Sequence, residues 1–362
     1  MPLSAYRVLD LTDERGQFAG FLLAQLGAEV ICVEPPGGQR SRRLGPFVDD
    51  EAGPERSLFH WAYNRGKRSV VLDDDDRLAA LSAGADVVLE CGAMPVDLAA
   101  LRAANPALIT VSITPFGSEG PKAGWLGGDL TLAAAGGVLS VTGDQDRPPV
   151  RISHPQSWLH GCADAVSATS IALRERARSG LGQHIDVSCQ QSLIAATQYC
   201  MMNTLVDAPP AKRIAGGLEL GPFKLRFVYE CVDGHVSVTY LFGSVIGPYT
   251  NRLFRWMFEE GACDASLAER NWVTYATDVL EGRASITVLE EAVGVIEAFT
   301  RARTQRELVE QASVKGALIA PIHTSRDILD LEHLEARYAG DPDVTIEEVE
   351  CLAACGNAPA MQ

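Results

Sequence analysis

The first 34 residues combine two apolar strand patterns with one helical pattern, and this feature restricts the possible folds more than any other. Residues 6–11 and 28–34 have the short apolar composition of buried strands, and residues 18–26 carry apolar side chains at helical spacing. Gly27 stands where a glycine commonly ends a helix. A strand, a helix and a second strand within about 30 residues form a βαβ unit. We therefore expect an α/β protein with a parallel, doubly wound sheet.

The same alternation continues along the chain. Residues 86–90 and 107–113 predict strands, and residues 96–104 predict the helix between them. A loop rich in glycine and proline follows at residues 116–125, and loops at the carboxyl ends of strands are where open α/β sheets bind ligands. A plain surface turn explains its composition equally well. A long helix is predicted from residue 157 to about residue 178.

The pattern changes after a Pro- and Gly-rich stretch that follows this first region. Two apolar strands flank Asp233-Gly234, a dipeptide typical of a hairpin turn, and helical patterns come next. We therefore predict a smaller α+β domain at residues 222–300. The large, Rossmann-like domain should combine residues 1–210 and 301–338, and residues 339–362 form an atypical C-terminal tail.

Charge and composition exclude several classes of protein. A formal net charge of -16 argues against nucleic acid or an anionic membrane as the main partner, because both require clustered Lys and Arg. No apolar run approaches the roughly 20 residues that a membrane span needs, and no secretory signal is visible. The nine cysteines are scattered and odd in number, which favours reduced thiols and a cytoplasmic location.

The opening βαβ unit does not carry a dinucleotide-binding fingerprint. Glu34 ends the second strand where an acid can hold a ribose hydroxyl, but Gly16 and Gly20 stand alone where G-x-G-x-x-G is required. The chain also lacks a Walker loop, H-E-x-x-H and G-x-S-x-G. We expect no metal site and no tightly bound cofactor.

Strings spread in order over more than 300 residues resemble the family III coenzyme A-transferases, the superfamily of formyl-CoA transferase, carnitine CoA-transferase and α-methylacyl-CoA racemase. The strings are RVLDLT at 7–12, LGAEVICVEPPGG at 26–38, RLGPF at 43–47, NRGKRSVVLD at 64–73, NPALITVSITPFGSEGP at 105–121, SGLGQHIDVS at 179–188, VYECVDGHVSV at 228–238 and TQRELVEQASVKGALIAPIHTSRDILDLEHLEAR at 304–337. The resemblance implies a Rossmann-like large domain, a smaller domain and two subunits interlocked as a dimer. It also implies that the large domain binds coenzyme A or acyl-CoA as a substrate.

Basic residues within these strings are candidates for binding the CoA phosphates. Arg43, Lys67 and Arg68 stand out in an acidic protein, and Asn64 belongs to the same turn as the latter two. Lys and Arg bind phosphate by charge-assisted hydrogen bonds. Without the surrounding strings, solvated surface charges would be the simpler interpretation.

The catalytic aspartate that the resemblance implies is missing. Counting back four residues from Gly161 of the motif places it at Ser157, and serine cannot form the aspartyl-CoA thioester of this family. Serine is a good helix N-cap, and we prefer that interpretation to a serine nucleophile. His154 and His160 flank the turn and are candidate bases, although a histidine near a helix start is more often structural.

The groups of the racemase members are absent as well, because Gly128 before Asp129 takes the place of their histidine. The chain most resembles the aspartate-lacking subunit of benzylsuccinate-type CoA-transferases. It should move CoA between an acyl-CoA and a small carboxylic acid together with an aspartate-bearing homologous subunit, as a homo- or heterodimer. A stand-alone acyl-CoA isomerase, racemase or hydrolase with His160 or Asp129 as base is an alternative. A catalytically silent CoA-binding scaffold is another.

The C-terminal tail differs from the rest of the chain. Residues 341–362 resemble part of the thioredoxin-like iron-sulfur subunit of NADH dehydrogenases. Cys351 and Cys355 supply only two of the four thiolates that a cluster needs, so we expect free thiols there.

Overall fold

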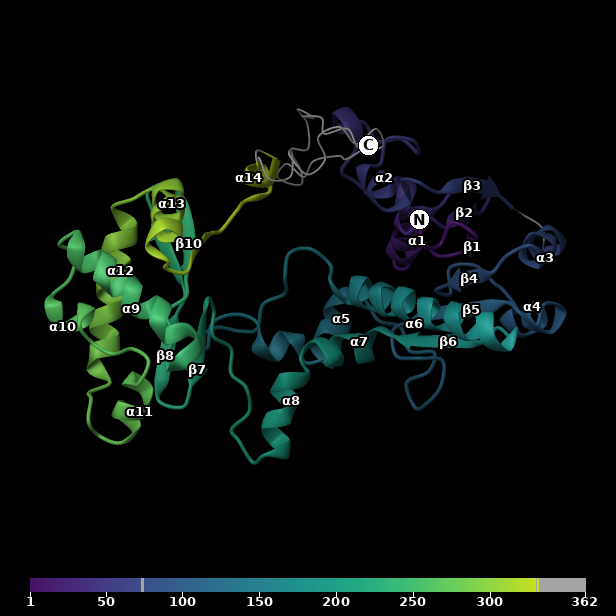
Figure 1. The fold of residues 1–362 in the computed structure, drawn as a ribbon. Helices are drawn as coiled ribbons and strands as arrows, with labels where there is room; N and C mark the ends of the chain where they lie inside the picture. The colour runs from purple at the N-terminus through teal and green to yellow at the C-terminus, as the bar shows by residue number, and fades with distance from the viewer. Residues whose placement is uncertain (73–74, 330, 332–362) are drawn as a thin grey trace. The chain divides into compact units, whose positions relative to one another are not determined.

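The computed structural model describes residues 1–72, 75–329 and 331 (Figure 1). The described residues form two compact units, Met1–Arg213 and Ile214–Leu331. Within them, no helix is both long and apolar enough to cross a membrane. No group of three or more His, Cys, Asp or Glu side chains among the described residues is arranged to hold a metal ion.

The first unit is built on a six-stranded parallel sheet with the strand order β3-β2-β1-β4-β5-β6. Its strands are β1 (Arg7–Asp10), β2 (Glu29–Glu34), β3 (Arg68–Val71), β4 (Val87–Glu90), β5 (Ile109–Thr114) and β6 (His184–Ser188). Its helices are α1 (Gln17–Gln25), α2 (Leu58–Asn64), α3 (Asp75–Ala83), α4 (Leu98–Ala104), α5 (Asp129–Ala135), α6 (Ser157–Ser179), α7 (Cys189–Ala196) and α8 (Gln198–Leu205), with short 3-10 helices at Arg40–Arg43, Val48–Asp50 and Val138–Val141. The predicted α/β class is confirmed.

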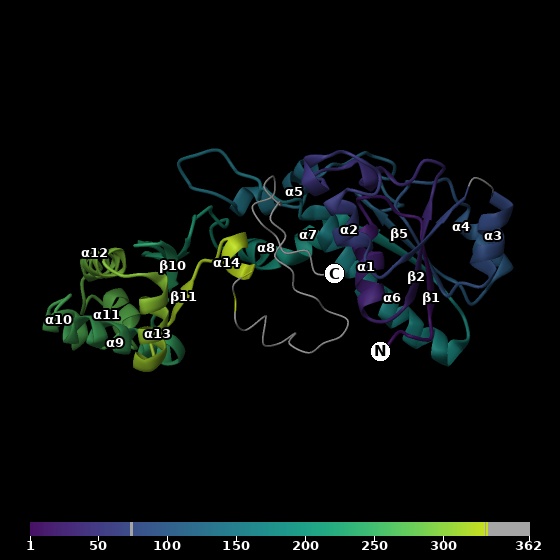
Figure 2. The same ribbon diagram turned by 90° about the horizontal axis from the view of Figure 1, so that it is seen from above.

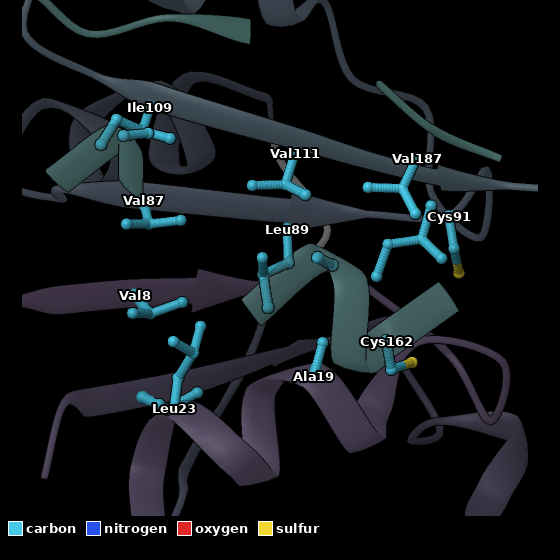
Figure 3. Close-up of a cluster of buried hydrophobic side chains, with 14 of the residues drawn as sticks. Val8, Ala19, Leu23, Val87, Leu89, Cys91, Ile109, Val111, Cys162 and Val187 are labelled. Atoms are coloured by element: carbon cyan, nitrogen blue, oxygen red, sulfur yellow. The ribbon is translucent and has the colours of Figure 1, made fainter. Parts of the chain in front are cut away.

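Strand side chains alternate between the two faces of the sheet, so each face carries its own apolar side chains. Different helices cover the two faces. On one face, the strands pack against Leu23 of α1 and Cys162 of α6 (Figure 3). On the other face lie α3 and α4 (Figure 2). The strands pack there against Leu78 of α3 and Leu98 of α4. The small side chains of α6 permit close packing, and a Cβ on Gly161 would lie 2.5 Å from Cys189 Sγ of α7.

The strand order reverses direction between β1 and β4. The chain builds outward from β1 through β2 to β3, then returns to add β4 on the other side of β1. Open α/β sheets bind ligands outside the carboxyl ends of their strands at such a switch point. The loops that follow β1 and β4 are therefore where a functional site is expected.

All seven cysteines among the described residues are free thiols. Cys32, Cys91, Cys162 and Cys189 are buried, and burial raises the pKa of each. These thiols are therefore held in their protonated form, in which Cys91 and Cys162 also donate hydrogen bonds.

The second unit is an α+β structure. Its strands are β7 (Gly217–Leu220), β8 (Phe223–Arg226), β9 (Val228–Cys231), β10 (Gly234–Val238) and β11 (Ile319–Pro321), and its helices are α9 (Gly243–Glu259), α10 (Ala265–Ala268), α11 (Tyr275–Leu280), α12 (Thr287–Arg301), α13 (Gln305–Lys315) and α14 (Ser325–Leu329). β9 and β10 form the predicted hairpin, with Cys231 opposite Gly234. The core of this unit is aromatic, and Tyr229, Trp256 and Trp272 are almost fully buried in it.

The structure draws the boundary between the units differently from the predicted domains. Residues 301–331 belong to the second unit, whereas the sequence suggested that residues 301–338 return to the first. The physical reason is that β11 pairs with β10, with Val236 opposite Pro321, and that Leu308 of α13 is fully buried in the aromatic core. Residues 332–338 and the tail lie outside the described residues.

Candidate functional site

The loop after β1, at the switch point, is tightly folded. Asp10 ends β1, and its Oδ1 accepts a hydrogen bond from the backbone N–H of Thr12 at 3.0 Å. A Cβ on Gly16 would lie 2.6 Å from Thr12 Cβ, so a glycine is needed where the loop enters α1. This compact turn fixes the residues between Thr12 and Gly16 at the carboxyl end of β1.

Lys67 is buried behind this loop. Its Nζ donates to Asp10 Oδ2 at 2.8 Å, to the Gln17 backbone oxygen at 2.8 Å and to Asn64 Oδ1 at 2.9 Å. Its side chain is 1% exposed, and a Cβ on Gly20 would lie 2.2 Å from Asp10 Oδ2. An ammonium group has three donors, and all three are used. Lys67 therefore ties β1, α1 and α2 together and has no donor left for a phosphate in this conformation.

Asn64 belongs to the same buried network. Its Nδ2 donates to Gln17 Oε1 at 3.0 Å and to the His60 backbone oxygen at 3.0 Å. Gln17 is fully buried, and its Nε2 has no hydrogen-bond partner among the described residues. That amide is a buried donor in need of an oxygen acceptor.

Arg43 and Arg68 are exposed, and the structure does not bring them together. Arg43 follows the carboxyl end of β2 and donates to the Gly37 backbone oxygen at 3.3 Å. Arg68 pairs with Glu29 at the amino end of β2, at 2.9 Å, and its side chain is 77% exposed. The residues predicted to bind CoA therefore comprise two exposed arginines at opposite ends of β2 and a buried Lys67–Asn64 pair.

Glu34 is closed to a ribose ligand by its own contacts. The residue is 1% exposed, and Arg42 holds its carboxylate through Nε and Nη2, both at 2.7 Å. Gln39 N–H and Ser69 Oγ donate to the same carboxylate. Burial alone would raise the pKa of Glu34, but the hydrogen bonds from Arg42 and Ser69 lower it to about 2.

Ser157 is the first residue of α6 and is fully buried. Its Oγ donates to the Asp129 backbone oxygen at 2.9 Å. The cap of α6 is Asp129, whose Oδ1 accepts from the N–H groups of Gln156 at 2.8 Å and Ser157 at 2.9 Å. The prediction that Ser157 caps the helix is wrong, because Gln156 holds the N-cap position and a carboxylate from α5 satisfies the free N–H groups.

The two histidines near this turn do not activate Ser157. His154 Nε2 lies 3.2 Å from the hydroxyl of Tyr63. His160 is partly exposed in the first turn of α6, and its imidazole makes no hydrogen bond within the described part of the chain. Because the Ser157 hydroxyl donates to a backbone oxygen, the structure contains no serine–histidine pair at this position.

Sequence reasoning missed a cluster at the switch point that joins the loops after β1 and β4 to α6. Arg15 donates from Nε to Asp13 Oδ1 at 2.8 Å and from Nη2 to Asp13 Oδ2 at 2.8 Å. Cys91, which follows β4, donates to the same carboxylate at 3.3 Å. The Arg15 guanidinium lies 5.5 Å from the ring centroid of Trp158, next to Ser157. In the sequence, the only sign of this cluster is an acidic and a basic residue two positions apart, Asp13 and Arg15, shortly after the first strand.

Comparisons with known proteins found similar sequences and similar folds. A model of CoA-transferase family III matches residues 3–359. The match includes most of residues 341–362, whose resemblance to an iron-sulfur subunit has no support in these comparisons. The chain is 31% identical to the succinyl-CoA:(R)-benzylsuccinate CoA-transferase subunit BbsE of Thauera aromatica, over 90% of this chain and 80% of that protein. It is 38% identical to the succinate–glutarate CoA-transferase of Agrobacterium fabrum, over 59% of this chain and 57% of that protein. A CaiB/BaiF family protein from Brucella suis superimposes with a TM-score of 0.76 and 27% identity, covering all of this chain and 91% of that one.

Proposed function

The chain belongs to CoA-transferase family III, and from this premise we propose that it binds acyl-CoA and takes part in transferring CoA to a small carboxylic acid. Support comes from the similar proteins, which are named as transferases that use succinyl-CoA or move CoA between acids. The switch point of the sheet provides the expected place for the site.

We further propose that a homologous subunit supplies the reacting carboxylate. The observation that carries this is the state of Ser157, which is fully buried with its hydroxyl committed to a backbone oxygen. In the expected chemistry, a carboxylate attacks the acyl-CoA carbonyl and becomes joined to the acyl group as a mixed anhydride. CoA thiolate is the leaving group. The thiolate then attacks the enzyme's acyl carbon, releasing the first acid and leaving an enzyme thioester. The acceptor acid attacks that thioester to form a second anhydride, from which CoA thiolate releases the enzyme carboxylate and the new acyl-CoA.

For CoA itself, we propose that Arg43 contacts a phosphate beyond the carboxyl end of β2. Its exposure and its single weak hydrogen bond leave donors available. Arg68, which pairs with Glu29 at the opposite end of β2, is left out of this proposed contact. Lys67 and Asn64 support the site by fixing α1 and α2 to β1.

The decisive experiment measures CoA transfer from succinyl-CoA to an acceptor acid by the purified chain, alone and with an aspartate-bearing homologue. We expect turnover only from the pair, and the Ser157→Ala variant should support the pair as well as the wild type. Turnover by the chain alone that Ser157→Ala abolishes would contradict the proposal. Isomerisation, racemisation or hydrolysis of the acyl-CoA by the chain alone, in dependence on His160 or Asp129, would favour a stand-alone enzyme of that kind, and CoA binding without turnover in any pairing would favour a scaffold.

The environment of the protein is part of the same proposal. Burial of four free thiols supports a reducing compartment such as the cytoplasm. A homologous subunit, either a second copy or a distinct chain, is the proposed partner in an interlocked dimer.

A further inference from the structure

Arg15 lies at the switch point and is held against the start of α6. It belongs to the loop between β1 and α1, and its backbone oxygen accepts a hydrogen bond from Cys162 Sγ at 3.4 Å. Its guanidinium lies 5.5 Å from the ring centroid of Trp158, which is 8% exposed. The side chain therefore lies against the first turn of α6, the helix that begins at Ser157.

Asp13 fixes the orientation of the guanidinium. Its two carboxylate oxygens accept from Nε and Nη2 of Arg15, each at 2.8 Å, and the Arg15 backbone N–H donates to it at 3.0 Å. Cys91 Sγ donates to the same carboxylate at 3.3 Å. Asp13 is only 8% exposed. A planar cation held along one edge by a buried carboxylate and on one face by a ring is already oriented for a ligand, which lowers the entropic cost of binding.

The other edge of the guanidinium is free. Arginine carries five N–H groups, and Asp13 accepts from the one on Nε and from one of the two on Nη2. No group among the described residues accepts from Nη1 or from the remaining Nη2 hydrogen, and the Arg15 side chain is 30% exposed. The neighbouring acid, Glu14, pairs with Arg40 instead, at 3.3 Å. The parallel N–H groups of Nη1 and Nη2 match the two oxygens of a carboxylate.

We propose that this free edge of Arg15 binds a carboxylate of a small dicarboxylic acid and so selects acids that carry a second charge. A carboxylate fits better than a phosphate because Asp13 already places a negative charge beside the cation, which disfavours a dianionic group. The inference rests on the proposed function for the identity of the acid, but the binding itself requires no transfer.

Calorimetric titration of the full-length chain with succinate tests the proposal. We expect one site per chain, and succinamide, which lacks the charges, should bind about tenfold more weakly or worse. Arg15→Gln and Arg15→Lys should each weaken succinate binding by about tenfold or more, since neither keeps the fork of N–H groups. Arg178→Gln, at the exposed end of α6, is the matched control and should bind as the wild type does.

Arg15→Lys retains a cation for Asp13 and serves if Arg15→Gln does not fold by circular dichroism. Equal succinate affinity in the wild type and a folded Arg15 variant would overturn the proposal, and so would an absence of succinate binding to the wild type. Arg15 would then only join the loop to α6. An Arg15-dependent succinate site without transfer in any subunit pair would refute the proposed function and leave this site standing.

Discussion

At the scale of single residues, Lys67 has a structural position that its motif did not suggest. Its ammonium group and the Asp10 carboxylate are both almost completely shielded from solvent. Burying two charges is costly, and removing one partner leaves the other uncompensated. The ion pair is thus a condition for the packing of α1 against β1, whatever its further role toward CoA.

We predict that Lys67→Met lowers the free energy of unfolding by about 3–5 kcal/mol, because Asp10 is left buried without its counter-ion. Arg68→Met is the matched control one position along, and loss of its exposed pair with Glu29 should cost less than about 1 kcal/mol. Urea unfolding followed by circular dichroism measures both. Similar losses in the two variants would show that the buried pair is not required.

His60 predicts how stability depends on pH. It is 6% exposed, its Nδ1 lies 2.8 Å from Ser41 Oγ, and burial followed by the nearby charge of Arg42 lowers its pKa to about 4. The folded protein therefore binds this proton less readily than the unfolded chain, whose histidine titrates near 6.5. The contribution to stability is complete above about pH 6.5 and is lost progressively as the pH falls toward about 4.

In His60→Gln, stability should vary less across this pH interval than in the wild type. Urea unfolding at several pH values gives the comparison, and His323→Gln, an exposed histidine of the second unit, is the control. An unchanged pH slope in His60→Gln would assign the effect to other groups.

The sequence predicted Arg43, Lys67 and Arg68 alike as phosphate-binding cations and could not show that the side chain of Lys67 alone is buried. Burial of Lys67 depends on Asp10 and Gln17, which lie 57 and 50 residues away in the chain. The Arg15–Asp13 pair was missed for a similar reason, because its importance comes from Cys91 and Trp158. Contacts of this kind arise only when the sheet brings distant loops together.

At the scale of elements, α6 depends on a cap supplied from outside its own sequence. The Asp129 carboxylate accepts from two free N–H groups at the helix start, where the positive end of the helix dipole favours a negative charge. A serine beside a helix start suggested a local cap. Tertiary structure replaced it with a carboxylate that is 28 residues away.

Asp129→Ala should therefore lower the free energy of unfolding by about 1–2 kcal/mol, as loss of a helix cap does. Ser157→Ala removes a single hydrogen bond and should cost about 1 kcal/mol. Asp164→Ala, on the exposed side of α6, should change stability by no more than about 0.5 kcal/mol. Thermal unfolding of the three variants ranks them, and an Asp129 variant as stable as the Asp164 variant would argue against the cap.

Elements with a strong periodic pattern were predictable. The opening strand, helix and strand correspond to β1, α1 and β2 within one or two residues, and the hairpin of β9 and β10 follows its Asp-Gly turn. Sequence reasoning instead treated the region of β3 as a turn, because a four-residue strand at the sheet edge with mixed polarity has little pattern of its own.

At the scale of the whole molecule, the second unit has the features of an independent domain. Its three-stranded sheet, the β7–β8 hairpin and helices α9 to α13 enclose a single aromatic core. The boundary was not predictable from local patterns, because β11 joins β10 across about 80 residues of intervening chain. From the sequence alone, the helix and the short strand after residue 300 fit either unit. Only the pairing of that strand with β10 assigns them to the second unit.

We predict that residues 214–331 expressed alone fold cooperatively. Buried Trp256 and Trp272 should give a near-ultraviolet circular dichroism signal that disappears in one transition on heating. A matched fragment that ends at residue 300 lacks α13 and β11 and should not show this transition. Similar behaviour of the two fragments would place the boundary where the sequence first suggested it.

The buried pair of Glu34 and Arg42 also bears on how this fold could change ligands over evolutionary time. A descendant that recruited NAD would need the Glu34 carboxylate for a ribose, yet Arg42 and Ser69 already occupy it. Losing Arg42 first would strand a buried anion, and losing Glu34 first would remove the group to be recruited. Neither order offers a neutral first step, so the internal contacts of Glu34 oppose dinucleotide binding in addition to the missing glycine fingerprint.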